Sequence, residues 1–191
     1  MNHSNPTFKV CLIGSGMMTP PLLDYLCAFG DTHITVASNL IDDANKLAAR
    51  HPQHMSAQML DVFNYQAVLD LVSKHNLVIS FIPPTMHMHV LKPCVEAGVN
   101  VVTSSYISPD MLTLNDACKA KGITFLNECG LDPGIDIMGT MKVVHEAHER
   151  GLKVVGYASY CGGLPVADQA DNPLGYKFSW NPGAAIKASR N

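Results

Sequence analysis

The sequence predicts an α/β fold with a doubly wound parallel sheet, followed by the start of a second domain of α+β type. Short apolar runs alternate with segments of helical periodicity, a pattern typical of parallel strands joined by crossover helices. The run at 77–82 is strongly apolar, as expected for a strand that helices cover on both faces. After Cys161 glycine, proline, asparagine and aspartate become frequent. We therefore predict a first domain at 1–160 and the beginning of a second at 161–191.

The expected strands are short apolar runs bounded by turn residues. The run at 55–60 is the weakest of them, and the run at 153–160 has the mixed pattern of a strand with one wet face. The predicted strands are 8–13, 33–37, 55–60, 77–82, 100–103, 123–127 and 153–160.

The expected helices occupy the segments between these strands. Pro20 lies in the first turn of one helix, where its missing N–H costs nothing, and Asp42 with Asp43 opens the next. Gly30 and Gly122 end two of the helices, as glycine commonly does. The predicted helices are 20–29, 42–50, 65–74, 86–97, 109–121 and 135–150.

Composition and charge argue against several classes of partner. The 191 residues have a net charge of -3 and no basic stripe, so we expect neither nucleic acid nor a membrane surface as a partner. No apolar run reaches the length of a membrane span, and the polar N-terminus does not resemble an export signal. The six cysteines include no C-x-x-C pair, so we expect reduced thiols in a cytoplasmic protein and no metal site.

A glycine turn joins the first strand to the first helix. Gly14 permits the tight turn, and Gly16 lets the backbone approach a pyrophosphate, which the helix N-terminus also attracts. The third position of this fingerprint is Thr19 rather than glycine or alanine, which weakens the match. An ordinary turn between strand and helix is the alternative. The context favours a Rossmann-type domain that holds a nicotinamide dinucleotide.

The end of the second strand predicts which dinucleotide is preferred. An acid at this place binds the ribose 2′-hydroxyl, whereas an arginine accepts a 2′-phosphate. The chain has Ser38 and Asn39 here, and Asp42 with Asp43 follows closely and would repel a phosphate. We therefore expect NAD as the cofactor, with NADP as the alternative. After the third strand, Asp61 is placed either to accept from the adenine amino group or to cap the next helix.

Polar segments also follow the later strands. Ligands of doubly wound sheets bind outside the carboxyl ends of the strands, so the segments at 82–85, 103–106 and 126–134 are expected to line one cleft. Part of the last segment, including Asp132, would alternatively serve as a loop and helix cap. The expected cofactor contacts are Gly14, Ser15, Gly16, Met17, Met18, Ser38, Asn39, Asp61, Val62, Ile82, Pro83, Thr103 and Ser104.

Several longer motifs are more specific than the glycine turn. With GSG at 14–16, they are TSSYISP at 103–109, NECGLDPGID at 127–136, YCGGLP at 160–165 and NPLGYKFSW at 172–180. In these motifs the chain resembles the glutamate-forming saccharopine dehydrogenases over nearly its whole length. This resemblance implies NAD(P)-dependent oxidation of saccharopine to glutamate and 2-aminoadipate 6-semialdehyde, a step of lysine metabolism. It also implies a substrate-binding and dimerisation domain after residue 160.

The same resemblance implies roles for individual residues. Ser105, Tyr106 and Asp132 are implied as substrate contacts. The catalytic residue is not identified by the sequence, and Asp132 and Glu128 are its candidates, because a carboxylate near the nicotinamide can take a proton.

The chain departs from the family pattern at a few positions. Asn39 replaces the arginine of members that use NADP, Pro84 replaces a frequent tyrosine, and Ile137 replaces a frequent histidine. Two other functions stay open. One is a related carboxyalkyl-amine dehydrogenase, such as carboxynorspermidine dehydrogenase, and the other is a non-catalytic nucleotide-binding module. Reduction of the cofactor that depends on a substrate separates the enzymes from the module.

Family members continue well beyond the length of this chain. The three carboxylates of saccharopine need several cationic donors, preferably arginines, whose fork matches a carboxylate. We expect the 191 residues alone to bind the cofactor without turning over saccharopine. The candidate partners are a small amino-acid substrate and a second copy of the chain. The cations after Gly151 are Lys153, Lys177, Lys187 and Arg190.

We expect NAD to bind more tightly than NADP. The charge-assisted contact to a 2′-phosphate that an arginine would make is absent at Asn39, at a cost on the order of 1.5–3 kcal/mol. Calorimetric titration of the protein with both cofactors measures the difference. Tighter binding of NADP would show that a cation from another part of the chain reaches the phosphate.

Overall fold

The computed structural model describes residues 8–178 and Gly183. Contacts divide the chain into a first unit, 1–134, and a second unit, 135–191, and each is described here by itself. This division falls before the last long helix, whereas the composition changes only after residue 160, and the domain boundary at 160/161 stays a prediction. Lys187, Arg190 and the end of the last quoted motif, 179–180, lie outside the described residues.

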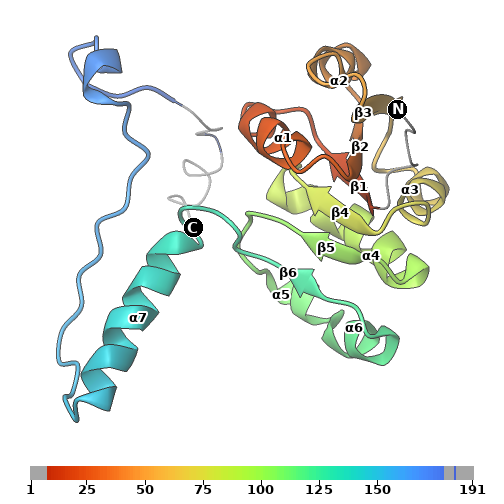
Figure 1. Cartoon of the computed structure of the whole chain (residues 1–191). Helices are drawn as coiled ribbons and strands as arrows, with labels where there is room; N and C mark the ends of the chain where they lie inside the picture. Colours follow the sequence, from red (N-terminus) through yellow and green to blue (C-terminus); the bar gives the residue numbers. More distant parts are fainter. Residues whose placement is uncertain (1–7, 179–182, 184–191) are drawn as a thin grey trace. The chain divides into compact units, whose positions relative to one another are not determined.

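The first unit is built on a six-stranded parallel sheet (Figure 1). The strands lie in the order β3-β2-β1-β4-β5-β6, so the chain starts in the middle and builds outward in both directions. This arrangement confirms the predicted Rossmann-type doubly wound sheet. The strands are β1 (Phe8–Ile13), β2 (Thr32–Ser38), β3 (Met55–Met59), β4 (Leu77–Ser80), β5 (Asn100–Val102) and β6 (Phe125–Leu126).

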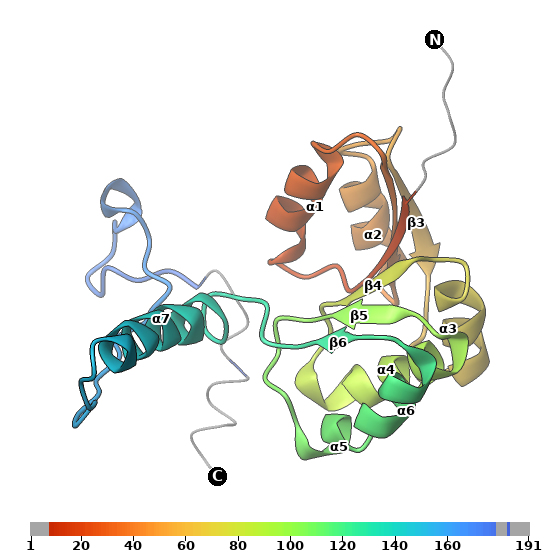
Figure 2. The same ribbon diagram turned by 60° about the horizontal axis from the view of Figure 1, so that its bottom comes forward.

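Helices cover both faces of this sheet. The helices α1 and α2 lie over one face, and α3, α4, α5 and α6 lie over the other (Figures 1 and 2). A short 3-10 turn, η1 (Pro84–Met86), precedes α4. The helices are α1 (Thr19–Cys27), α2 (Ile41–Ala48), α3 (Tyr65–Val72), α4 (His87–Ala97), α5 (Pro109–Leu112) and α6 (Asn115–Lys121).

The predicted helix at 109–121 is wrong in one respect, because it is broken into α5 and α6. Ser108 caps the start of α5 by accepting a hydrogen bond from the backbone N–H of Met111 at 3.3 Å. Thr113 then donates its hydroxyl to the carbonyl of Asp110 at 2.6 Å. A threonine that bonds to the backbone of the preceding turn competes with helix continuation, and α5 ends there.

The central strand β1 supplies side chains to both cores. Val10 and Leu12 point to the cluster formed with α1 and α2, while Cys11 and Ile13 point to the cluster formed with α3 and α4. All four side chains are at most 2% exposed. Successive side chains of a strand point to opposite faces, so one apolar run anchors helices on both sides.

The second unit begins with α7 (Ile135–Glu149). The predicted strand at 153–160 is wrong, because residues 152–166 have no regular secondary structure. A strand forms only where another strand accepts its backbone hydrogen bonds, and no described strand lies beside this segment. A 3-10 turn, η2 (Ala167–Gln169), follows. Among the described residues, no helix is long and apolar enough to cross a membrane.

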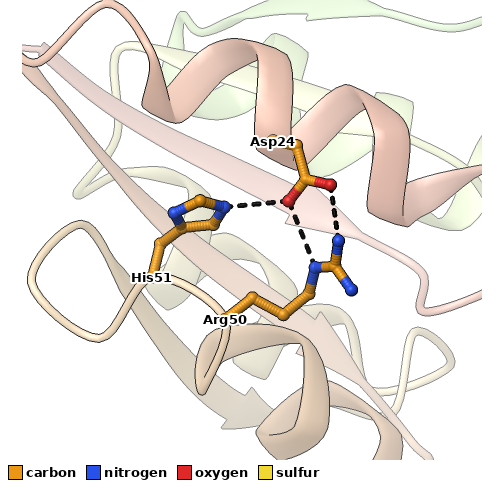
Figure 3. Close-up of polar contacts among 3 residues, drawn as sticks. All are labelled: Asp24, Arg50 and His51. Carbon is orange, nitrogen blue, oxygen red and sulfur yellow. Dashed lines mark hydrogen bonds and ion pairs between the residues drawn. The ribbon is translucent and has the colours of Figure 1, made fainter.

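An ion-pair cluster ties α1 to the segment that follows α2. Asp24 accepts hydrogen bonds from the guanidinium of Arg50 and, at 2.8 Å, from Nε2 of His51 (Figure 3). The hydrogen bonds from Arg50, followed by that from His51, lower the pKa of the Asp24 carboxyl from 3.8 to about 2. The two segments are far apart in the sequence, so this cluster exists only in the folded chain.

The cluster makes stability depend on pH in a defined direction. The folded-state pKa of Asp24 lies below its ordinary value, so its stabilisation is fully present above about pH 4 and is lost as the pH falls through about 2. We expect Asp24→Asn to lower the melting temperature at pH 7, with a deficit that narrows as the pH falls below 4. Thermal melts of both proteins between pH 7 and pH 3 measure this deficit.

The control is Asp31→Asn, which removes a carboxylate that makes no ion pair in the described part of the chain. This variant should melt like the wild type throughout the same range. A deficit of Asp24→Asn that stays constant down to pH 3 would contradict the assignment of the low pKa.

Candidate functional site

The candidate site lies at the edge of the sheet where the strands end. Parallel strands place all their carboxyl ends at the same edge. The direction in which successive strands are added to the sheet reverses between β1 and β4, which is the switch point of the fold. The segments that follow β1, β2, β4, β5 and β6 therefore meet there. The side chains in these segments are the ones that the sequence singles out.

Gly14 allows the segments after β1 and β4 to approach closely. Its φ of +122° is open to glycine and strained for other residues. A Cβ at this position would lie 2.4 Å from the carbonyl oxygen of Phe81, which follows β4. The N–H of Gly14 also donates to the carbonyl of Ala37 in β2 at 2.9 Å. Any side chain at Gly14 would thus push β1 and β4 apart at the switch point.

Gly16 has the opposite surroundings. A Cβ at Gly16 would meet no atom within 4 Å, so the space beside its backbone is open. Its carbonyl accepts from the N–H of Thr19, the first residue of α1, at 3.0 Å. The neighbouring Met17 and Met18 are exposed. An open space against glycine backbone at a helix N-terminus is what a pyrophosphate requires, so these residues fit a bound dinucleotide.

Thr19, the third fingerprint position, is completely buried, and its hydroxyl finds no hydrogen-bond partner among the described residues. An unsatisfied buried hydroxyl costs about 1–3 kcal/mol. Glycine and alanine, the usual residues at this position, have no hydroxyl and avoid that cost. This difference explains why Thr19 matches the dinucleotide-binding fingerprint less well.

The end of β2 offers hydroxyl and amide groups. The hydroxyls of Ser15 and Ser38 are 2.9 Å apart, and Ser38 also accepts from the N–H of Leu40 at 3.0 Å. Asn39 is exposed at this point. Further along, Asp43 pairs with Lys46 at 3.1 Å, so this lysine is already engaged by a carboxylate. The groups at the end of β2 suit a ribose hydroxyl better than a phosphate.

Asp61 is not the cap of α3. Its carboxylate accepts from the N–H of Phe63 at 3.0 Å, within the turn after β3. The cap is Asn64, whose side chain accepts from the N–H of Ala67 at 3.1 Å. This finding removes the helix-cap alternative, and the adenine contact of Asp61 stays a prediction. The adjacent Val62 packs against the core.

The turn after β4 is held against β1. Phe81 donates its N–H to the carbonyl of Ile13 at 2.8 Å. Ile82 packs against the core, while Pro83 is exposed at the edge of the sheet. Of the two predicted contacts in this turn, the backbone near Pro83 is therefore the accessible one.

Backbone hydrogen bonds join the segments after β5 and β6. Glu128 donates its N–H to the carbonyl of Ser105, and Cys129 donates to the carbonyl of Thr103, each at 3.1 Å. Thr103 is 2% exposed, whereas Ser104 is half-buried and lies close to Gly130. These bonds extend the strand pairing into the site and fix the two segments side by side.

The segment after β6 contains two unusual backbone conformations. Glu128 has a φ of +62°, which is uncommon for a residue other than glycine and costs of order 1–3 kcal/mol. Gly134 has a φ of +148°, and a Cβ there would lie 2.1 Å from the carbonyl oxygen of Gly130. The Glu128 carboxylate accepts from the N–H of Ile107 at 3.1 Å. This strained turn therefore holds the backbone next to Tyr106 in place.

Tyr106 and Asp132 form a polar pair across these two segments. The Tyr106 hydroxyl donates to the Asp132 carboxylate at 2.6 Å, and both side chains are exposed. The two residues are 26 positions apart in the sequence, and the structure brings them together, whereas their role as substrate contacts stays a prediction. A carboxylate bonded to a phenol can accept a proton or hold a substrate ammonium group.

A buried histidine connects β4 to Ser105. His87, the first residue of α4, is completely buried, and its two ring nitrogens lie 2.9 Å from the Ser80 hydroxyl and 2.8 Å from the Ser105 hydroxyl. Burial lowers the pKa of its imidazole from 6.5 to about 4. The sequence analysis did not identify His87. The available signal was a histidine at the start of the helix that leaves β4.

Two family models match the chain. Residues 10–126 match the saccharopine dehydrogenase NADP binding domain, and residues 130–191 match the saccharopine dehydrogenase C-terminal domain.

Curated relatives with similar sequences have consistent names. The chain is 47% identical over 186 residues to the saccharopine dehydrogenase [NADP(+), L-glutamate-forming] of Pyricularia oryzae, which covers 97% of the chain and 41% of that protein. It is 43% identical over 183 residues to the enzyme of the same name from Saccharomyces cerevisiae, covering 96% of the chain and 41% of that protein. The chain thus spans about two fifths of the length of these relatives.

A solved structure agrees with these matches. The apo, histidine-tagged saccharopine dehydrogenase (L-Glu forming) from Saccharomyces cerevisiae superimposes with a TM-score of 0.85 at 42% sequence identity. This match covers 96% of the chain and 41% of the solved chain. The fold of the described residues and their sequence therefore point to the same family.

We expect Gly16→Val to fold normally and to lose cofactor binding. Its side chain would enter open space in the free protein but would occupy the volume that a pyrophosphate needs. The variant should melt like the wild type without cofactor and should lack the stabilisation that cofactor gives. That stabilisation is about 2.7 kcal/mol at a cofactor concentration of 100 times Kd. Thermal melts with and without NAD or NADP measure it.

Two other glycines provide controls. Gly156→Val also places a side chain in open space, but Gly156 belongs to the second unit and not to the glycine turn, so this variant should keep the full cofactor effect. Gly14→Val should be strongly destabilised even without cofactor, because its side chain would collide with the backbone of Phe81. An unchanged cofactor effect in Gly16→Val would place the phosphate site elsewhere.

Proposed function

The chain belongs to the saccharopine dehydrogenase family, and we propose that its protein oxidises saccharopine to glutamate and 2-aminoadipate 6-semialdehyde with NAD(P) as oxidant. The observation that carries this proposal is the meeting of two groups of residues at one sheet edge. Ser105, Tyr106 and Asp132 lie beside one another there, at the same edge as the open backbone of Gly16. This arrangement gives a dinucleotide and an amino-acid substrate a common site.

The proposed reaction balances as follows. The C–H bond on the carbon that becomes the semialdehyde, next to the secondary amine nitrogen of saccharopine, would break with loss of a hydride, and a C=N bond to that nitrogen would form. Water adds to this bond, the carbon–nitrogen bond then breaks, and glutamate and the semialdehyde are released with one proton. The chemistry that the cofactor supplies is the acceptance of the hydride. The protein must keep the amine neutral, move protons and hold three carboxylates.

Residues of the first unit would hold the dinucleotide. The Gly16 backbone and the N-terminus of α1 would hold the pyrophosphate, and Ser38 with Asn39 would hold the adenosine ribose. The relatives carry NADP(+) in their names, which supports NADP as the alternative to NAD. The preference for NAD rests on the uncharged Asn39 and stays a prediction.

On the substrate side, we assign the proton acceptor to Asp132 rather than to Glu128. The Glu128 carboxylate is turned towards the backbone N–H of Ile107, where it supports the loop. The Asp132 carboxylate is exposed and bonded to the hydroxyl of Tyr106, so it can exchange a proton with a ligand and with the phenol. Glu128 would then act on the reaction only by positioning Tyr106.

Compartment and assembly belong to the same proposal. Four cysteines, Cys11, Cys27, Cys94 and Cys118, are buried thiols without a disulfide bond, which supports a reducing compartment such as the cytoplasm. Apolar side chains of α7 are exposed in the described part of the second unit, among them Met138 and Val143, so a second copy is proposed to cover them.

The test is a steady-state assay of the full-length protein with saccharopine and NAD or NADP. We expect formation of reduced cofactor that depends on saccharopine, together with release of glutamate. Turnover of carboxynorspermidine but not of saccharopine would reassign the substrate. Cofactor binding without turnover of either amine would indicate a non-catalytic module.

Two carboxylate variants distinguish the assigned roles. Asp132→Asn should lower kcat by about 10²–10⁴-fold, the usual contribution of a general acid–base group. Glu128→Gln keeps an acceptor for the N–H of Ile107 and should retain most of the activity. The reverse order of effects would transfer the role of proton acceptor to Glu128.

A further inference from the structure

A chain of three polar side chains runs beneath the substrate side of the site. The hydroxyl of Ser80, at the end of β4, lies 2.9 Å from Nδ1 of His87, and Nε2 of His87 lies 2.8 Å from the hydroxyl of Ser105. Ser80 and His87 are completely buried, whereas Ser105 is half-buried at the sheet edge. The chain therefore leads from the core to the site.

The imidazole in the middle of this chain is neutral at physiological pH. It is removed from water, and this burial lowers its pKa to about 4. A neutral imidazole has one N–H donor and one acceptor nitrogen. Each of its two serine neighbours must therefore play a different role, one as donor and one as acceptor.

The surroundings of Ser80 decide which role each serine plays. Among the described residues, the Ser80 hydroxyl makes its hydrogen bond to His87 alone. If Nδ1 carried the proton, Ser80 would have to accept, and its own buried hydrogen would have no acceptor. An unsatisfied buried donor disfavours that arrangement by about tenfold or more. With the proton on Nε2, Ser80 donates to Nδ1 and His87 donates to Ser105, so the buried donors of both Ser80 and His87 are satisfied.

In this arrangement the Ser105 oxygen accepts the hydrogen bond from Nε2 of His87, and the Ser105 hydroxyl hydrogen is available to donate to a ligand. Its backbone is held as well, because its N–H donates to the Thr103 hydroxyl at 3.2 Å and its carbonyl accepts from Glu128. A fixed hydroxyl that can only donate outward favours an acceptor without hydrogens, and a carboxylate is the strongest such acceptor in an amino-acid substrate.

We propose that His87 is a positioning residue that fixes the Ser105 hydroxyl as a hydrogen-bond donor to a carboxylate of the substrate. Ser105 then contributes to specificity through the direction of its hydrogen, and His87 contributes without touching the ligand. This inference rests on the proposed function for the identity of the substrate. The protonation pattern of the Ser80–His87–Ser105 chain does not depend on that function.

The first experiment determines the tautomer directly. Nitrogen NMR of the full-length protein labelled with 15N-histidine separates imidazoles protonated at Nε2 from those protonated at Nδ1. We expect the His87 signal to be that of a neutral ring with its proton on Nε2 from pH 8 down to about pH 5. A neutral ring protonated on Nδ1, or a protonated ring at neutral pH, would overturn the proposal.

Assignment of the signal uses variants. The His87 signal is the one lost in His87→Gln and shifted in Ser80→Ala, so either variant is sufficient if the other does not fold. The tautomer is read from the wild-type protein, and no variant has to be active for this measurement to decide.

The second experiment reads the effect on substrate binding. Gln reproduces the predicted pattern, because its carbonyl oxygen can accept from Ser80 and its amide can donate to Ser105. We expect His87→Gln to keep KM for saccharopine within a few-fold of the wild type. Ser105→Ala and His87→Leu should raise KM about 10- to 100-fold, with a smaller effect on kcat.

The outcomes separate this inference from the proposed function. Equal KM values for wild type, Ser105→Ala and His87→Leu would overturn the role of the chain in substrate binding. A loss confined to kcat would do the same, because it would indicate a role in the chemical step. Absence of saccharopine turnover in the wild type would instead overturn the proposed function, while the NMR result would still decide the tautomer.

Discussion

Strand β1 sets the geometry on which the rest of the first unit depends. It pairs with β2 on one side and with β4 on the other, and its alternate side chains anchor the helices on both faces of the sheet. Its last residue, Ile13, leads directly into Gly14, whose backbone packs against Phe81. Because no side chain fits between these backbones, the turns after β1 and β4 can meet, and the candidate cofactor site forms at that meeting point.

The substrate side of the site is fixed in a different way. Its residues come from the segments after β5 and β6, which continue to exchange backbone hydrogen bonds beyond the ends of their strands. The strained backbone of Glu128 and the tight approach of Gly134 hold the second segment against the first. These constraints bring the Tyr106 hydroxyl to Asp132 and keep Ser105 above His87. Backbone strain in this segment thus accompanies the fixed placement of a few polar groups, as is typical of functional sites.

The similarity to the family and the geometry of the site support the proposed function with evidence from different parts of the chain. Matches to the family cover both units of the chain, whereas the detailed geometry of the site lies in the first unit alone. The end of β2 is the place where the two lines of reasoning differ most. The relatives are named for NADP(+), while this chain has the uncharged Asn39 where a phosphate-binding arginine would be expected.

The sequence by itself determined the parallel sheet, the glycine turn and the candidate site segments, because periodicity and turn chemistry are properties of neighbouring residues. Most helices agree with the prediction to within a few residues, whereas the break after Leu112 was not predicted because it depends on the side-chain bond from Thr113. Only the tertiary structure decided which distant side chains meet. The bond from Tyr106 to Asp132, the chain through His87 and the cluster around Asp24 each join segments that become neighbours through the order of the strands and the packing of the helices on them. The missing strand at 153–160 has the same cause, because a strand needs a partner that its own residues cannot supply.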